Sequence, residues 1–196
     1  LRKKYLGLKQ YHTYDRFLEL AHSNKEYTYE EAKELFFNSI SQFPQDFQDK
    51  AHEVLKDGFV DVMEKVGKRT GAYSSSVANL HPFILLNFDN TLDSVFTVAH
   101  EAGHSIHSMY ATQTQPTMLQ DYTIFVAEIA STFNEHTLLD YFLSLPDATK
   151  EEKIMVIQKA IDEIMGTFYR QTLFAEYEYL ANNEVAKGNP INHQVL

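Results

Sequence analysis

The sequence has 196 residues, 44% apolar and 22% charged, which is enough to bury a sizeable core and unlike a disordered or fibrous chain. Its net charge of -10 argues against a nucleic-acid partner, and the absence of cysteine excludes disulfides and cysteine-ligated zinc. Because no apolar run approaches the roughly 20 residues that span a bilayer and no signal peptide is recognisable, we expect a cytoplasmic protein without a membrane partner.

Two helices are predicted in the first third of the chain. Thr28, followed by Glu31, has the pattern of a capping box and begins a helix that ends before Pro44. A second amphipathic pattern predicts a helix over residues 46–66, which Gly67 stops.

A short β element is predicted next. Residues 67–80 contain two Gly and three Ser and have no period, so we expect a loop. The apolar run 83–88 has the length of a strand, and the preceding Pro82 suggests the edge of a sheet.

The rest of the chain is predicted to be helical. A helix from Asn90 or Thr91 reaches about Tyr110, and another covers residues 121–143. A last long helix covers residues 149–186, with a bend expected at its internal glycine. The predicted fold class is therefore mainly α, with a small β element near the helix that begins at Asn90 or Thr91.

The sequence His-Glu-Ala-Gly-His at residues 100–104 predicts a zinc site. On a helix, His100 and His104 share one face about 6 Å apart, so their rings can converge on one zinc ion. Glu101 lies about 100° round the helix from His100, too far for a natural third ligand. It is well placed to take a proton from a water molecule, as a general base does.

The surroundings of this pentapeptide favour a metal over a chance pattern. An apolar run, residues 95–99, precedes His100, so the helix is expected to be largely buried. Buried imidazoles need hydrogen-bond or metal partners, because each unpaired buried polar group costs roughly several kcal/mol. Gly103 costs about 1 kcal/mol inside a helix, which suggests that another backbone element packs closely against it.

The third ligand is predicted on the following helix. Glu128 is the single charge in a run of apolar and small residues, and a lone carboxylate there is unfavourable unless a cation meets it. Glu135, seven residues on, lies on the same helix face and is either an acceptor for a ligand histidine or the ligand itself. The long metzincin pattern does not fit, because His107 and Tyr110 occupy the positions of its Gly and third His.

Two other polar residues share the histidine face. His107 is one turn beyond His104, too far along for one tetrahedral ion, so we expect a packing or supporting role. Asp93 is expected to be an acid of the first helical turn or a supporting partner.

Five segments in order resemble the oligoendopeptidase F branch of the thimet oligopeptidase family, and together they span most of the chain. They are Gly-Lys-Arg-Thr-Gly-Ala-Tyr-Ser at 67–74, His-Pro-Phe-Ile-Leu-Leu-Asn at 81–87, and the longer runs 96–107, 125–135 and 170–178. The resemblance implies a soluble, mainly helical, gluzincin-type zinc endopeptidase that cuts short peptides inside a deep channel. It assigns one zinc to His100, His104 and Glu128, and the base to Glu101.

Two departures from the family lead to further expectations. Family members are longer on both sides, so we expect residues 1–196 to form part of a catalytic domain. The family's His and Tyr residues that stabilise the oxyanion lie beyond the position of Leu196, so we expect weak turnover from the chain alone. Uncovered apolar helix faces would then favour self-association.

The resulting hypothesis is a zinc endopeptidase acting on short oligopeptides. Lys68, Arg69, Tyr73 and His81 either line its cleft or belong to an ordinary turn and strand, and the strand edge either pairs with substrate or does not. The alternatives are a non-catalytic zinc- or peptide-binding module descended from such an enzyme, and a helical interaction domain that binds no zinc.

Overall fold

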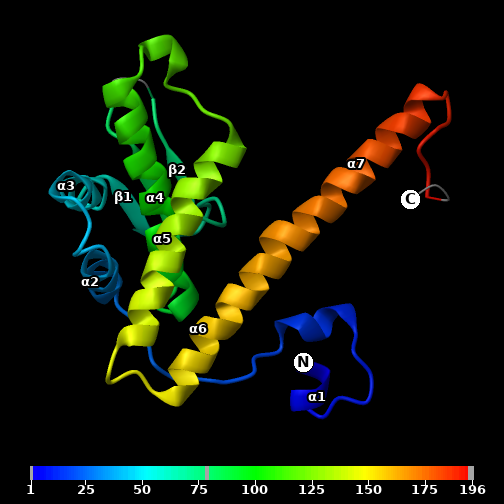
Figure 1. Ribbon diagram of the computed structural model, residues 1–196, viewed down its shortest axis with the longest axis horizontal. Helices are drawn as coiled ribbons and strands as arrows, with labels where there is room; N and C mark the ends of the chain where they lie inside the picture. The colour runs from blue at the N-terminus through cyan, green and yellow to red at the C-terminus, as the bar shows by residue number, and fades with distance from the viewer. Residues whose placement is uncertain (1, 78–79, 194–196) are drawn as a thin grey trace. The chain divides into compact units, whose positions relative to one another are not determined.

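The computed structural model describes residues 2–77 and 80–193, and it divides the chain into two compact units. One unit comprises Ser23–Thr149, and the other comprises Leu1–His22 with Lys150–Leu196. Figure 1 shows their elements, which are α1 Arg2–Tyr5, a 3-10 turn Thr13–Phe17, α2 Tyr29–Ser39, α3 Gln45–Val54, β1 Val60–Met63, β2 Tyr73–Ser75, β3 Phe83–Phe88, α4 Leu92–Thr114, a 3-10 turn Thr117–Leu119, α5 Ile124–Ser144, α6 Lys150–Glu163, a π-helical segment Ile164–Tyr169 and α7 Arg170–Ala186.

The unit Ser23–Thr149 packs helices against a three-stranded sheet of order β1-β3-β2. Strand β1 runs parallel to β3, with Val60 opposite Ile84, and β2 runs antiparallel to it, with Ser74 opposite the same Ile84. The strand predicted at residues 83–88 is confirmed, but its placement at a sheet edge was wrong, because β3 is the central strand.

Two further predictions fail in this region. The helix predicted over residues 46–66 ends at Val54, because Gly58 turns the chain with a φ of 90° and the following segment pairs with β3 as a strand. The predicted loop 67–80 contains β2, whose pairing with β3 no local pattern reveals. Ala78 and Asn79 of that loop lie outside the described residues.

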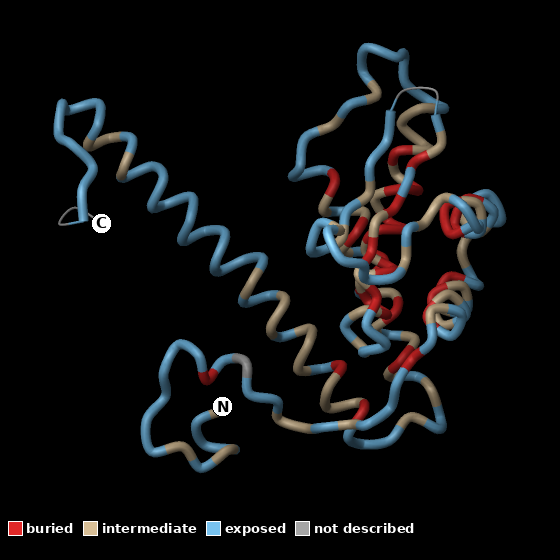
Figure 2. The backbone as a smooth tube through the Cα atoms, turned by 180° about the vertical axis from the view of Figure 1, so that it is seen from behind, coloured by how far each residue is buried: buried red, intermediate tan, exposed pale blue. Residues whose placement is uncertain are grey.

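Helix α4 lies at the centre of this unit. It contacts α2, α3 and α5 as well as strands β2 and β3. Buried residues gather on α4 and on the elements around it (Figure 2). The largest fully buried side chains include Phe36, Ile40, Leu86, Phe96, Ile106 and Leu138. A helix packed on several sides cannot shift easily, so side chains on α4 have fixed positions.

The helix starts follow the predicted caps. The Thr28 hydroxyl accepts from the Glu31 backbone N–H at 3.2 Å, and the Glu31 carboxylate accepts from the Thr28 backbone N–H at 2.7 Å, which confirms the capping box. At α4 the Thr91 hydroxyl accepts from the Ser94 backbone N–H at 3.2 Å, so the helix begins at the second of the two predicted positions.

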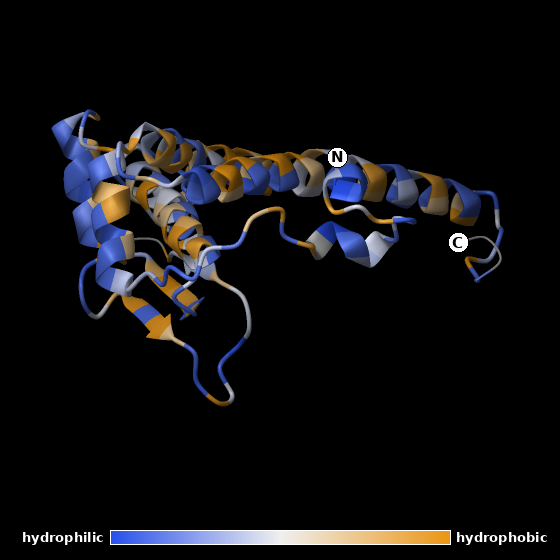
Figure 3. Ribbon diagram, turned by 90° about the horizontal axis from the view of Figure 1, so that it is seen from below, coloured by the Kyte–Doolittle hydropathy of each residue, from blue (hydrophilic) through white to orange (hydrophobic). Residues whose placement is uncertain are grey.

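The other unit is built on the long helical stretch 150–186. The bend predicted at Gly166 coincides with a π-helical segment, in which the α-helical hydrogen-bond pattern is interrupted. Arg2 pairs with Asp162 through two nitrogen–oxygen contacts of 2.9 and 2.5 Å. Apolar residues recur along this stretch (Figure 3), and many are exposed in this structure, including Ile161, Phe168, Leu173 and Leu180. Within the described residues, no helix is both long and apolar enough to cross a membrane.

Candidate metal centre

Two histidines of α4 face each other at the centre of the site. His100 and His104 are one helical turn apart, and their Nε2 atoms lie 3.1 Å from each other. Both rings are partly buried, because α4 is covered by α5 on this side. Two imidazole nitrogens directed at the same point provide two of the ligand atoms that zinc prefers.

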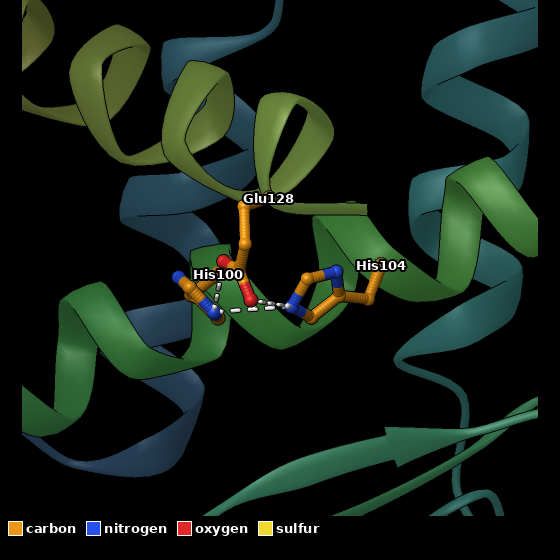
Figure 4. A group of neighbouring side chains, drawn as sticks. All are labelled: His100, His104 and Glu128. Carbon is orange, nitrogen blue, oxygen red and sulfur yellow. Dashed lines mark hydrogen bonds and ion pairs between the residues drawn. The ribbon is translucent and has the colours of Figure 1, made fainter. Parts of the chain in front are cut away.

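Glu128 of α5 completes a group of three ligand atoms (Figure 4). Its Oε2 lies 3.6 Å from His100 Nε2, and its Oε1 lies 3.9 Å from His104 Nε2. One ligand atom from each of the three residues lies within 4.8 Å of the others. Among the described residues this is the one group of three such side chains, and two His with one Glu are a donor set that suits zinc.

The glycine between the histidines allows α5 to approach closely. A Cβ atom at Gly103 would lie 2.8 Å from the Ala130 carbonyl oxygen and 2.9 Å from the Ser131 Cα. The side chain of Asn134 donates to the Ala99 carbonyl oxygen at 3.3 Å beside this contact. The expectation that a backbone element packs against Gly103 is therefore confirmed.

The outer edges of both imidazoles are held by α5. Glu135 accepts a hydrogen bond from Nδ1 of His100, and the His104 ring hydrogen-bonds the backbone of Ala127. Burial lowers the pKa of His100, but the hydrogen bond and charge of Glu135 outweigh it, so the pKa is raised. The pKa of His104 is lowered by burial and by the nearby His100. Of the two roles open to Glu135, the structure shows the contact with a histidine.

Glu101 is enclosed beside the histidines. Its side chain is only 5% exposed, and its Oε2 is buried without a hydrogen-bond partner. Burial raises the pKa of Glu101 to about 7, although the charge of His100 and a hydrogen bond from the Ser74 backbone oppose the rise. A carboxylate with a pKa near neutrality and a free oxygen can accept a proton and release it again.

The other polar residues singled out in the sequence lie apart from this group. His107 stacks on Tyr122, with ring centroids 4.0 Å apart, which fits the packing role expected for it. Asp93 lies in the first turn of α4. Lys68 donates to the carbonyl oxygens of Asp61 and Met63 at 2.9 and 2.7 Å, as a residue of an ordinary turn would.

The remaining cleft candidates also make local contacts. His81 stacks on Phe59 with ring centroids 3.6 Å apart, and the Arg69 guanidinium lies 5.9 Å from the Tyr73 ring. Sequence reasoning did not single out Ser74, whose hydroxyl lies 2.8 Å from that of Ser105 on α4 and whose backbone bonds Glu101. Its position depends on strand pairing, so no local signal could have identified it.

The residue pattern matches a known protein family along nearly the whole chain, from residue 1 to residue 195. The chain belongs to peptidase family M3. Within M3 it is similar to oligopeptidase PepF of Bacillus subtilis, with 38% identity over all of this chain and 29% of the relative. It is also similar to group B oligopeptidase PepB of Streptococcus agalactiae, with 35% identity over all of this chain and 32% of the relative.

A solved structure supports the fold. A crystal structure of a protein from Chlamydophila abortus, described as a peptidase, superposes with a TM-score of 0.81 and 40% identity, covering all of this chain and 33% of that one. The mainly helical fold with a small sheet is therefore confirmed, as is the resemblance to oligoendopeptidase F. The chain spans about a third of the length of the M3 relatives that it matches.

Proposed function

We propose that this chain carries the zinc-binding and catalytic core of an endopeptidase that hydrolyses internal bonds of short oligopeptides. The observation that carries the proposal is the convergence of His100, His104 and Glu128, whose ligand atoms lie within 4.8 Å of one another. Membership of peptidase family M3 supports hydrolysis of peptides, and the relatives named above are oligopeptidases. One zinc ion per chain is the proposed cofactor.

The residues present fit that ion. Two neutral imidazoles and one carboxylate form a three-ligand protein set of the kind found in catalytic zinc sites, which keep a further position for water. Glu135 and the Ala127 backbone hold the outer edges of the two rings, as partners of zinc-bound histidines commonly do. When bound, zinc would supply Lewis acidity toward the scissile carbonyl and lower the pKa of water.

Glu101 is the proposed general base. Its unpaired, buried Oε2 can take a proton from the attacking water, and the protonated carboxyl can then deliver it to the leaving amine. Zinc binding alone does not need this carboxylate, so its presence favours an enzyme over a non-catalytic zinc- or peptide-binding module.

Metal analysis combined with an activity assay tests the proposal. The purified chain is expected to contain one zinc, and Glu128→Ala, whose affinity should be far weaker, is expected to be purified without it. The full product of the gene is expected to cleave a fluorogenic oligopeptide, to lose that activity with a chelator, and to regain it with zinc. Zinc binding without any cleavage would point to the binding module, and a chain that binds no zinc would refute the proposed site.

A further inference from the structure

A buried hydroxyl on α5 contacts the carboxylate of Glu128. Ser131 lies three residues after Glu128 and is 0% exposed. Its Oγ lies 2.9 Å from Glu128 Oε2 and 3.1 Å from the Glu128 carbonyl oxygen. Because a serine hydroxyl carries one proton, it can serve only one of these two acceptors at a time.

The carboxylate is the better acceptor for that proton. Within the described residues, 2–77 and 80–193, no other donor hydrogen-bonds this carboxylate, since the Nε2 atoms of His100 and His104 lie 3.6 and 3.9 Å from it. A bond to an ionised acceptor is also roughly twice as strong as one between neutral groups.

Glu128 needs such a contact to stay in place. Its side chain is 44% exposed, in contrast to Glu135, which is 11% exposed and is held against His100. A half-exposed glutamate has several accessible rotamers and loses that freedom when it binds a metal. A fixed hydroxyl that holds the carboxylate beforehand reduces this loss, which is the general effect of preorganisation.

The hydroxyl itself is fixed by the crossing of α4 and α5. The Ser131 Cα would lie 2.9 Å from a Cβ at Gly103, so the glycine of the zinc-site sequence sets how near Ser131 comes to α4. Ser131 is thereby held by the same helix that carries both histidines. A shift of Ser131 relative to α4 would move the Glu128 carboxylate relative to the rings.

We infer that Ser131 is a positioning residue that orients the Glu128 carboxylate toward His100 and His104 for metal binding. This inference rests on the metal site proposed above. It assigns to Ser131 a role in metal affinity and in the geometry of the site, without contact to substrate. Losing a partner of a metal ligand typically weakens metal binding by about 10- to 100-fold.

The first experiment compares Ser131→Ala with Thr132→Val in the 196-residue chain. Both changes remove a hydroxyl from the same turn of α5, but among the described residues the Thr132 hydroxyl donates to backbone carbonyl oxygens and to no side chain. The dissociation constant for zinc is measured by competition with a chromogenic chelator. We expect about 10- to 100-fold weaker binding in Ser131→Ala and wild-type binding in Thr132→Val.

Further measurements separate positioning from a general loss of stability. The visible absorption of the Co²⁺-loaded chain should change in Ser131→Ala and not in Thr132→Val, because it reports ligand geometry. In a double-mutant cycle, Ser131→Ala should have little further effect on zinc affinity once Glu128 is replaced by alanine. Thermal unfolding of the metal-free variants shows whether each variant is folded. Ser131→Thr keeps the hydroxyl and should bind more tightly than Ser131→Ala.

The outcomes are distinguishable from failure of the proposed function. Should the wild-type chain bind no zinc, the metal site and this inference both fail. Should the wild-type chain and Ser131→Ala bind zinc equally tightly, the metal site stands and the inference is overturned. The inference is also overturned if Ser131→Ala weakens zinc binding by the same factor whether residue 128 is glutamate or alanine. If Ser131→Ala does not fold, Ser131→Thr is compared with the wild type instead. The two proteins are then expected to have equal Co²⁺ spectra and equal zinc affinities. Weaker zinc binding by a correctly folded Ser131→Thr variant would overturn the inference.

Discussion

The carboxylate of Glu135 accepts a hydrogen bond from Nδ1 of His100, across the crossing of α5 and α4. Since a carboxylate can only accept, the Nδ1 atom carries the proton and the Nε2 lone pair is directed toward His104 and Glu128. The contact thus fixes the ring and the tautomer that a metal ion requires.

Removal of this acceptor should weaken metal binding without abolishing it. We expect Glu135→Ala to bind one zinc per chain with about 10- to 100-fold lower affinity, because His100 would keep its nitrogen but lose its orientation. Glu128→Ala should suffer a larger loss, because a ligand atom disappears. Chelator competition gives both constants. Full zinc retention in Glu128→Ala would instead identify Glu135 as the third ligand.

A second prediction concerns the close crossing of α4 and α5 at Gly103. Gly103→Ala should destabilise the unit Ser23–Thr149, because the new Cβ would meet two backbone atoms at 2.8 and 2.9 Å. Overpacking of this kind costs about 1–3 kcal/mol, which exceeds the gain of about 1 kcal/mol in helix propensity. Urea unfolding followed by circular dichroism measures the change.

Gly166→Ala is the matched control for that variant. A Cβ at Gly166 would meet nothing within 4 Å, so we expect unchanged or slightly increased stability. Equal stability of Gly103→Ala and the wild type would show that α5 moves aside without cost.

The sequence predicted the parts of this structure that depend on local signals. The helices that begin after Thr28 and Thr91 each have a capping residue, and residues 83–88 form a continuous apolar run of strand length. The four site candidates were also identifiable, since His100, Glu101 and His104 share one turn and Glu128 is an unusual charge in an apolar run.

What the sequence did not predict depends on contacts between distant segments. Residues 60–63 continue an apolar pattern that suits a helix, and only the neighbouring strand β3 makes them β1. Ser74 and Ser131 have no distinctive local pattern, and their contacts with Glu101 and Glu128 depend on the strand pairing and on the helix crossing.

A third prediction concerns the pH dependence of the metal-free protein. Burial raises the pKa of Glu101 from 4.5 to about 7, so the folded state holds this proton more tightly than the unfolded state does. Its contribution to stability is therefore fully present below pH 4.5 and is lost as the pH rises to about 7.

Glu101→Gln cannot ionise and should lack this dependence. Relative to the wild type, its free energy of unfolding should increase between pH 4.5 and pH 7, by at most about 3 kcal/mol. The measurement is chemical denaturation at several pH values with a chelator present. A constant difference between the two proteins across this range would mean that Glu101 is not desolvated in the folded state.

The same variant separates the proposed base from the proposed ligands. Glu101→Gln should retain zinc, because the ligand atoms of His100, His104 and Glu128 are unchanged and the amide has nearly the shape of the carboxyl group. It should nevertheless lose nearly all peptidase activity, since an amide cannot accept the proton of the attacking water. General acid–base catalysis contributes about 10²- to 10⁴-fold, so a fall in turnover of that size is expected.

Zinc content is measured on the 196-residue chain and on the full product of the gene, and turnover of a fluorogenic oligopeptide on the latter. Thr132→Val is the control, because it alters the neighbouring helix without touching a proposed ligand atom or base. Turnover near the wild-type rate with zinc retained would show that another group accepts the proton, whereas loss of zinc would show that Glu101 takes part in binding the metal.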